Sequence, residues 1–245
     1  MCSGQPATKR INAHANMKNA VSRNLFMTCF CILPRALTSP TCPYQNNAMC
    51  NHYRMNPDAI PTWREYIGAA PYDGEGPDIK IDIWPKYQAI VARIENDEKT
   101  LDTMAWGVPL AVPGKREGTT VTKRITNVRN LTSPFWRSTL SKPAQRCLVP
   151  FSSFAEPKPN AGRDECWFQV TGAHVAAFAG IWRPSAEGNV FAILTCEPNP
   201  VVAPIHPKAM PVILHPEDYD RWFQSDYDEA CSLVAPFPSQ LMSVD

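Results

Sequence analysis

Short apolar runs separated by turn residues fill the chain from residue 57 onward. Apolar positions at helical spacing behind a proline-led start predict a short helix over 57–67. Runs of strand length predict strands over 87–94 and 100–108, on either side of the charged turn "ENDEK", and over 189–198. The pattern therefore indicates a β-rich chain with few helices.

Two further segments carry turn or cap signals. Thr171 and Gly172 interrupt the apolar run 166–182, which predicts a hairpin there. Acidic residues at the start of 215–223 favour a helix, because they complement the positive end of the helix dipole. The chain also has 25 prolines, which force many non-helical connections. We therefore expect irregular loops to carry the functional site.

Composition changes near residue 49. Residues 1–48 contain five basic residues and no Asp or Glu, and their longest apolar stretch, 25–33, is too short to span a bilayer. The stretch and its acid-free surroundings also fit a targeting segment, or upstream sequence translated from a mis-assigned start. Four of the nine cysteines lie here without a CxxC pair. We expect residues 1–49 to be a disordered extension, absent or removed in the active protein.

The rest of the chain, 50–245, has the length of one domain. From Met49 on, the chain contains 19 of the 24 basic residues and all 23 acidic residues, which gives a formal charge of −4. Nucleic-acid binding would therefore need a local basic patch. Five scattered cysteines argue against a disulfide framework and suit a reducing cytoplasm. The sequence contains no transmembrane stretch and no ligand-spaced cluster for a metal.

Polar residues stand in unusual positions at several places. Asn127 and Arg129 lie in "TNVRN", Glu156 ends the run "CLVPFSSFAEP", and His206 stands between prolines in "APIHPKAMPVIL". Each alone has an ordinary explanation as a cap, a surface charge, a strand end or a loop histidine. The nucleophile Cys50 in "MCNHYR" changes that balance, because Cys, Glu, His and Asn together suit thiol or imine chemistry.

From Met49 on, the chain resembles the SOS response-associated peptidase (SRAP) family of abasic-site processing proteins. The resemblance is carried by "MCNHYR", "WGVP" at 106–109, "NVRN" at 127–130, "RCLVPFSSFAEP" at 146–157, "FAGIW" at 178–182 and "IHPKAMPVIL" at 205–214. It implies a single α+β domain around an irregular, barrel-like antiparallel β-sheet with a few short helices.

The resemblance also implies a set of site residues. Cys50 matches the cysteine that becomes the mature N-terminus, and the other catalytic positions are Asn127, Glu156 and His206. The implied DNA contacts, listed together, are Arg129, Trp106, Pro85 with Trp84 before it, and His52. Trp106 has core packing as an equally good explanation. The sequence departs from the family at Asn51 and His52, where Gly and Arg are common, at Pro157, and in "HPKAMP".

The implied chemistry requires a free α-amine on Cys50. An abasic site opens to an aldehyde, which the amine attacks to give an imine, and the thiol then closes a five-membered thiazolidine. Glu156 would move the protons of the amine, His206 would protonate the sugar oxygen, and Asn127 would orient the amine. Arg129 would bind a phosphate. Self-processing and lyase activity are associated expectations.

The expected partner is single-stranded DNA with abasic sites, without a cofactor, and the expected protein is a cytoplasmic monomer that joins the nucleoid when bound. Two other classes of function fit the same residues. One is a cysteine amidohydrolase or peptidase, in which Cys50 attacks an amide. The other is a non-catalytic single-stranded DNA-binding module, which would tolerate Cys50→Ala.

Overall fold

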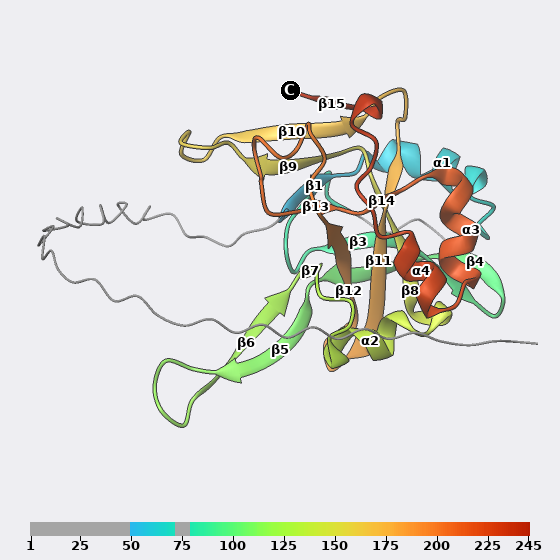
Figure 1. Cartoon of the computed structure of the whole chain (residues 1–245). Helices are drawn as coiled ribbons and strands as arrows, with labels where there is room; N and C mark the ends of the chain where they lie inside the picture. The colour runs from blue at the N-terminus through green and yellow to red at the C-terminus, as the bar shows by residue number, and fades with distance from the viewer. Residues whose placement is uncertain (1–49, 72–78) are drawn as a thin grey trace, which may run out of the picture. The chain divides into compact units, whose positions relative to one another are not determined.

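Strands rich in Val, Ile, Phe and Ala close into a barrel in this computed structural model, which describes residues 50–71 and 79–245 (Figure 1). Five strands follow one another around it in the order β12–β4–β3–β8–β11 and back to β12. The β12–β4 pair is parallel and the other pairs are antiparallel. Closure leaves no free edge among these strands. They are β3 (Gln88–Glu95), β4 (Glu98–Trp106), β8 (Arg146–Phe151), β11 (Ala176–Ser185) and β12 (Gly188–Cys196).

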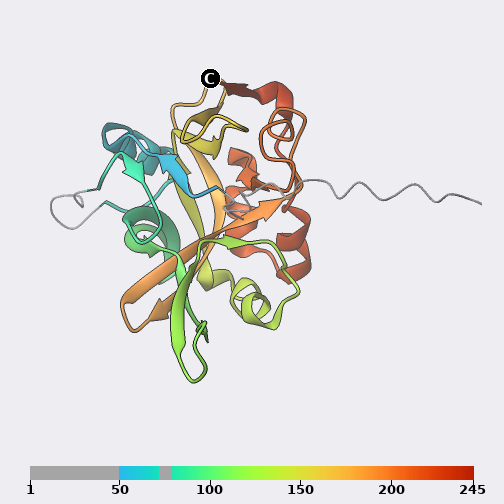
Figure 2. The same ribbon diagram turned by 90° about the vertical axis from the view of Figure 1, so that its left-hand side faces the viewer.

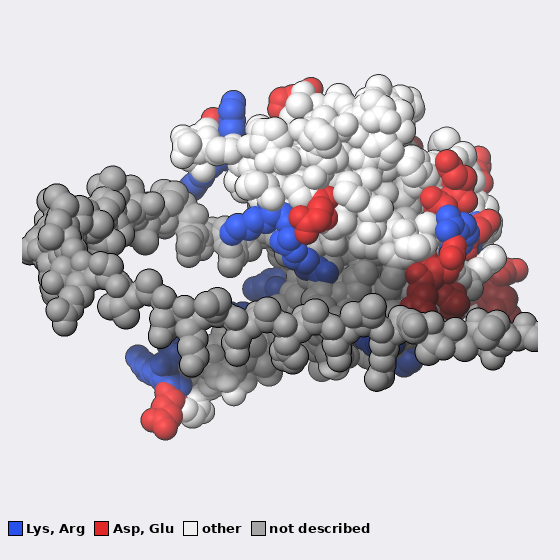
Figure 3. All heavy atoms as spheres, viewed as in Figure 1, with Lys and Arg blue, Asp and Glu red and all other residues white. Residues whose placement is uncertain are grey.

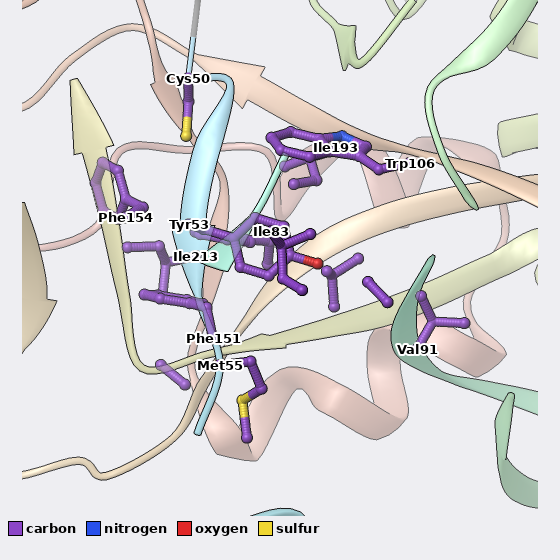
Figure 4. Close-up of a cluster of buried hydrophobic side chains, with 14 of the residues drawn as sticks. Cys50, Tyr53, Met55, Ile83, Val91, Trp106, Phe151, Phe154, Ile193 and Ile213 are labelled. Carbon is purple, nitrogen blue, oxygen red and sulfur yellow. The ribbon is translucent and has the colours of Figure 1, made fainter. Parts of the chain in front are cut away.

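Alternate side chains of the barrel strands enter two different core clusters. One core cluster takes Val149 and Phe151 of β8 and Phe178 of β11, whereas a second cluster takes Ala177 and Ala179 of β11. Strand geometry explains the division, because alternate side chains point to opposite faces. Gly180 makes this packing possible: a Cβ there would lie 2.8 Å from the Cys147 sulfur. Figure 4 shows Cys50 at the edge of the first cluster, with its sulfur directed toward it.

A smaller antiparallel sheet carries the start of the domain. Its strand order is β15–β10–β9–β1–β2. Cys50 lies two residues before its strand β1, and Glu156 lies within its strand β9. The five strands are β1 (His52–Arg54), β2 (Asp82–Ile83), β9 (Ser153–Pro157), β10 (Glu165–Val170) and β15 (Met242–Val244).

Short strands and helices complete the fold. Strand β7 (Asn127–Val128) pairs with β12, β13 (Met210–Pro211) pairs with β12, and β14 (Ile213–Leu214) pairs with β11. A separate hairpin, β5 (Val108–Pro113) and β6 (Thr120–Ile125), projects from the barrel in both views (Figures 1 and 2). Apolar residues of the helices join the second core cluster. The helices are α1 (Ile60–Tyr66), α2 (Pro134–Leu140), α3 (Tyr219–Gln224) and α4 (Tyr227–Ser232).

The α+β fold with a barrel-like sheet and short helices is confirmed. Turns of 3₁₀ helix followed by α1 and α3 occupy the two predicted helical segments, and β3, β4 and β12 occupy the three predicted strands. The predicted extension 1–49 lies outside the described residues. No helix in the described part of the chain is long and apolar enough to cross a membrane.

The predicted hairpin over 166–182 is wrong. Its two strands exist as β10 and β11, but β10 pairs with β9 and β15, whereas β11 pairs with β8, β12 and β14. Thr171 follows β10 and donates its backbone N–H to Leu241, next to the C-terminal strand β15. Distant segments therefore supply the partners that the local turn signal assigned to neighbours.

Arg146 is a fully buried arginine that ties helices to the barrel. Its guanidinium donates hydrogen bonds to the backbone carbonyls of Leu140, Trp222, Ser225 and Asp226, at 2.7–3.0 Å. Within the described part of the chain, its hydrogen-bond acceptors are these carbonyls and the Ser225 hydroxyl. Replacing Arg146 therefore leaves buried carbonyls without a donor. No second substitution can remove these acceptors, because they belong to the backbone.

We expect Arg146→Met to lower the free energy of unfolding by at least about 3 kcal/mol, since each stranded buried carbonyl costs roughly 1–3 kcal/mol. Urea unfolding followed by tryptophan fluorescence measures the loss. The control is Arg183→Met, because Arg183 makes one 3.5 Å hydrogen bond and stacks on Phe135. That change should cost only about 0.5–1 kcal/mol. Equal stabilities for the two variants would contradict the assigned role of Arg146.

Candidate active site around Cys50

The backbone of Cys50 is held at both ends by buried polar side chains. Its N–H donates to Glu156 Oε1 at 3.1 Å, and its carbonyl accepts from Asn127 Nδ2 at 3.2 Å. All three residues are buried, with Cys50 only 2% exposed. The structure thus brings together three of the four predicted catalytic residues, although 77 and 106 positions separate Asn127 and Glu156 from Cys50.

Strand pairing sets these positions. Asn127 opens β7, which runs parallel to β12 and pairs with Ile193. Glu156 lies opposite Cys166 in the β9–β10 pair, and β9 also pairs with β1, so the carboxylate lies on the strand next to the Cys50 segment. Two strands from different sheets therefore deliver the amide and the carboxylate to one residue. A one-residue slip of β9 would turn Glu156 to the opposite face.

Two oxygen atoms at this site have no hydrogen-bond partner among the described residues. They are Asn127 Oδ1 and Glu156 Oε2, both buried. Buried polar atoms are seldom left unsatisfied, so such atoms call for an explanation. A bound molecule or an N-terminal ammonium group would supply the missing donors. The site thus has acceptor capacity that the chain itself leaves unused.

Burial shifts the protonation equilibria of both reactive groups. Loss of solvent raises the pKa of Glu156 to about 8, against the smaller opposing effect of its hydrogen bond from Cys50. Burial, and then the charge of Glu156, raise the pKa of the Cys50 thiol well above its ordinary value. The thiol is therefore disfavoured as a free thiolate, and Glu156 can hold or release a proton near neutral pH.

Thr126 and Asn51 extend the network and were missed by sequence reasoning. Asn127 Nδ2 also donates to Thr126 Oγ1 at 2.9 Å, and that hydroxyl donates to Asn51 Oδ1 at 3.0 Å. The chain of bonds fixes the orientation of the Asn127 amide, because its nitrogen must face Thr126 and Cys50. A departure of Asn51 from the family pattern was the one signal that could have indicated this contact.

His206 lies on the segment between β12 and β13 and is half-buried. Its Nδ1 is 2.7 Å from the Ala209 carbonyl, which can only accept, so Nδ1 carries the proton in this contact. Among the described residues, none of its hydrogen bonds reaches Cys50, Asn127 or Glu156. Its catalytic role stays a prediction, with Nε2 as the atom left for proton transfer.

His52, a predicted DNA contact, is buried with both ring nitrogens hydrogen-bonded. Its ring nitrogens lie 2.8 Å from Glu165 and 3.0 Å from Asp82, and its ring is stacked on Trp84 at 3.7 Å. Trp167 covers another side of the same ring. With the ring buried and both nitrogens engaged by carboxylates, His52 ties strand β1 to β2 and β10. The predicted DNA contact by His52 stays a prediction.

The other predicted DNA contacts have different surroundings. Trp106 is fully buried, and its indole nitrogen donates to the Thr126 carbonyl at 3.1 Å, so it has no face open to a base. Its burial agrees with the core-packing explanation, and a DNA contact by Trp106 stays a prediction. Trp84 is 40% exposed and Pro85 beside it is half-buried. Arg129 is exposed and pairs with the exposed Glu197 at 3.1 Å.

The described residues, 50–71 and 79–245, contain no group of three or more His, Cys, Asp or Glu side chains arranged to hold a metal ion. The groups in contact at Cys50 are its nitrogen and carbonyl, the Glu156 carboxyl group and the Asn127 amide, beside the Cys50 thiol.

Comparisons with known proteins agree on the fold. Solved structures similar to this chain include a protein from Bordetella bronchiseptica (24% identity, TM-score 0.64, covering 80% of this chain and 98% of that one). A protein from Bacteroides thetaiotaomicron has 20% identity and a TM-score of 0.61, covering 80% of this chain and 90% of that one. A phage-related protein from Bordetella bronchiseptica has 18% identity and a TM-score of 0.58, covering 81% of this chain and 93% of that one. No curated protein matches the chain.

The family comparison covers most of the chain. The model of the family described as SOS response associated peptidase (SRAP) matches residues 49–245. This range begins one residue before Cys50 and includes Asn127, Glu156 and His206. The chain belongs to the SRAP family.

Proposed function

We propose that the domain beginning at Cys50 captures abasic sites in single-stranded DNA as a covalent thiazolidine. The observation that carries the proposal is the 3.1 Å contact between the Cys50 nitrogen and the Glu156 carboxyl group. With residues 1–49 absent, that nitrogen is a primary amine next to a group that can exchange its protons. Membership of the SRAP family supports a peptidase-type enzyme, and the DNA chemistry is the finer proposal.

The proposed steps use the groups in contact with Cys50. Glu156 takes a proton from the α-ammonium, and the neutral amine adds to the aldehyde carbon of the opened sugar. Glu156 then protonates the departing hydroxyl, so that water leaves and an imine forms. The thiol adds to the imine carbon, and its proton moves to nitrogen, which closes the five-membered ring. No oxidant or reductant is required.

Asn127 and His206 have supporting roles in this scheme. Asn127 holds the Cys50 carbonyl, and its unpartnered Oδ1 can accept from the ammonium or from a sugar hydroxyl. His206, with Nδ1 fixed by Ala209, would use Nε2 to protonate the sugar oxygen as the ring opens, or to assist strand cleavage. Release of residues 1–49 would begin with attack of the Cys50 thiol on the Met49 carbonyl, which breaks the peptide C–N bond as the α-nitrogen takes a proton. Water would then hydrolyse the resulting thioester, which frees the thiol and releases residues 1–49 as a carboxylic acid.

A cysteine amidohydrolase is the second candidate, and the electrostatics disfavour it. Such enzymes need a reactive thiolate, usually formed beside an imidazole. Here burial and Glu156 raise the pKa of the Cys50 thiol, and its sulfur contact is the His52 carbonyl, at 3.7 Å. Ring closure onto an imine does not need a standing thiolate in the same way, because the thiol is already held beside the carbon that it attacks.

The deciding experiment compares Cys50 with Cys50→Ser in a chain expressed from Met49 with the initiator removed. Wild type should give an adduct with abasic single-stranded DNA that survives denaturing electrophoresis. The serine variant keeps the α-amine but cannot close the sulfur ring, so its adduct should require borohydride trapping. Non-covalent binding should be the same for both proteins, measured on undamaged DNA. A serine adduct as stable as that of wild type would overturn the thiazolidine, and peptide hydrolysis without adduct would favour the amidohydrolase.

A further inference from the structure

The hairpin β5–β6 begins and ends at the candidate active site. Trp106 and Gly107 precede β5, and Thr126 and Asn127 follow β6 directly. At this junction the Trp106 indole donates to the Thr126 carbonyl, and Thr126 continues the hydrogen-bond network to Asn51. The position of the hairpin is thus fixed by the same residues that orient Asn127.

Gly107 allows the chain to leave the barrel at this point. Its φ of +112° lies in the region that favours glycine, and a Cβ there would lie 3.0 Å from Arg124 Cβ. Arg124 in turn donates to the Gly107 carbonyl and pairs with Glu187 of the β11–β12 turn. These contacts hold the base of the hairpin, while its far end extends away from the barrel (Figures 1 and 2).

The β5–β6 hairpin is basic, and three of its four cations are not paired with an acid in the described structure. Lys115, Arg116 and Lys123 are exposed, and none has a carboxylate within ion-pair distance among the residues that the structure describes. The segment 108–125 contains one acidic residue, Glu117, against four basic ones. Many other arginines of the domain are paired, including Arg54, Arg93, Arg129 and Arg221.

The opposite charge gathers on another part of the surface. The helical segment 216–232 has six acidic residues and one arginine. Figure 3 shows red acidic side chains over α3 and α4, and a group of blue side chains at the tip of the β5–β6 hairpin, with one acid beside them. A domain that is acidic overall therefore presents a separate basic arm beside its reactive residue. Such an asymmetric field directs a polyanion to the basic side.

The hairpin also leaves apolar surface uncovered. Leu110 lies opposite Lys123 and Val112 lies opposite Val121, so these four side chains share one face of the ribbon. Val121 is exposed, and Leu110 and Val112 are only half-buried. A two-stranded ribbon has little stability of its own in water. Exposed aliphatic residues beside unpaired cations suit a ligand that has both negative charge and apolar surface. Single-stranded nucleic acid has both, because its bases are unpaired.

We infer that the β5–β6 hairpin is an arm that binds the phosphates of the DNA strand on one side of the abasic site. Lys115, Arg116 and Lys123 contact the phosphates, and the face with Val121 lies against the bases and sugars. The arm gives affinity and direction, whereas the chemistry stays with Cys50. This inference rests on the proposed function, because it uses the same DNA strand and the same site.

The first test measures non-covalent binding of an undamaged, fluorescent single-stranded oligonucleotide. Replacing Lys115, Arg116 and Lys123 by Gln removes three contacts, each of which contributes roughly −0.7 to the slope of log K against log salt. The slope should become shallower by about 2, and affinity near 0.15 M salt should fall by roughly 50-fold. Lys123→Gln alone is compared with Lys142→Gln, an exposed lysine outside the hairpin. The first should weaken binding by roughly fourfold and the second should not.

The second test asks where the arm lies along the strand. Adduct formation is measured at low protein concentration with the abasic site close to the 5′ end of one oligonucleotide and close to the 3′ end of another. The triple variant should slow the reaction with only one of them, the one whose longer flank reaches the hairpin. At saturating DNA its final adduct yield should equal that of wild type, because Cys50, Glu156 and Asn127 are unchanged.

The outcomes separate this inference from the proposed function. If wild type forms no adduct, the proposed chemistry fails. The binding measurements on undamaged DNA still test whether the hairpin contacts the strand, because they do not depend on adduct formation. If adducts form but the triple variant matches wild type in salt slope and with both oligonucleotides, the arm is overturned. Equal slowing with both oligonucleotides would overturn the placement of the arm on one side of the abasic site and would indicate a general charge effect. Loss of self-association in the variant, with DNA binding intact, would assign the basic arm to the acidic helices of a second copy instead.

Discussion

A chain whose first residue is Cys50 should form a stable adduct with abasic single-stranded DNA, and a chain that keeps residues 1–49 should form none. The difference lies in one nitrogen. In the longer chain it is an amide nitrogen, which donates to Glu156 and has no nucleophilic lone pair, whereas in the shorter chain it is an amine with a pKa near 8. The effect should be all-or-none, and denaturing electrophoresis with intact mass measures it.

Intact mass also distinguishes the ways in which the longer chain could become active. If the Cys50 thiol attacks the preceding carbonyl, the protein should lose its first 49 residues over time, and adduct should appear only as the shortened species does. The control is the longer chain with Cys50→Ser, which should shorten more slowly and give no adduct without borohydride. An adduct that carries the mass of the complete 245-residue chain would contradict the N-terminal mechanism.

Glu156→Gln should slow adduct formation by roughly 10²–10⁴-fold, the usual contribution of a positioned acid–base group. Glutamine preserves the shape of the side chain and can still accept the hydrogen bond from the Cys50 nitrogen, but it cannot take up or release a proton. The rate of adduct formation in the chain beginning at Cys50 is the measurement. A rate within a few-fold of wild type would remove Glu156 from the chemistry.

The same substitution should stabilise the 245-residue chain, increasingly as pH rises. The folded state holds the Glu156 proton up to a pKa of about 8, whereas the ordinary value is 4.5. Between these values the unfolded chain has lost a proton that the folded chain keeps, so wild-type stability falls by up to about 1.4 kcal/mol per pH unit. Glutamine does not titrate. The advantage of Glu156→Gln should therefore be small near pH 4.5 and grow to a few kcal/mol at pH 8.

Urea unfolding of both proteins across this pH range checks the expectation. The matched control is Glu187→Gln, because Glu187 is exposed and pairs with Arg124 at the surface, so its replacement should leave the pH dependence unchanged. Slow chemistry combined with higher stability would identify Glu156 as a buried acid–base group. Slow chemistry with lower stability would instead mean that the carboxyl group mainly supports the fold.

The sequence predicted more of the site than of its surroundings. Cys50, Asn127 and Glu156 stood out because a nucleophile, an amide and a carboxyl group lay in motifs that resemble one family, and hydrogen bonds join them in the structure. The Thr126–Asn51 bond depends on how the base of the β5–β6 hairpin meets the start of β1, which no local pattern specifies. The same holds for His52, whose two carboxylate partners come from β10 and from the start of β2.

Errors in the predicted fold have a related cause. Thr171 and Gly172 do form a turn, and both flanking strands exist. Each strand, however, pairs with the most favourable partner in the whole chain, which here is not its neighbour in sequence. The C-terminal strand β15 and strand β9 occupy the edges of β10, and β8 and β12 occupy those of β11. Trp106 shows why the burial of a single side chain is hard to predict from sequence. It ends strand β4, and only the closed barrel determines that its side chain is buried.

The distances along the sequence between Cys50 and its partners affect how the protein folds. The contacts to Asn127 and Glu156 span 77 and 106 residues, and the barrel itself closes through the parallel pairing of β4 with β12. Such long-range contacts are associated with slow folding, because loop closure must precede them. Glu156 and Asn127 therefore reach Cys50 only late, once the barrel is complete. A partly folded chain has the nitrogen and the thiol of Cys50 but lacks the buried carboxyl group, so any acid–base assistance from Glu156 belongs to the native protein alone.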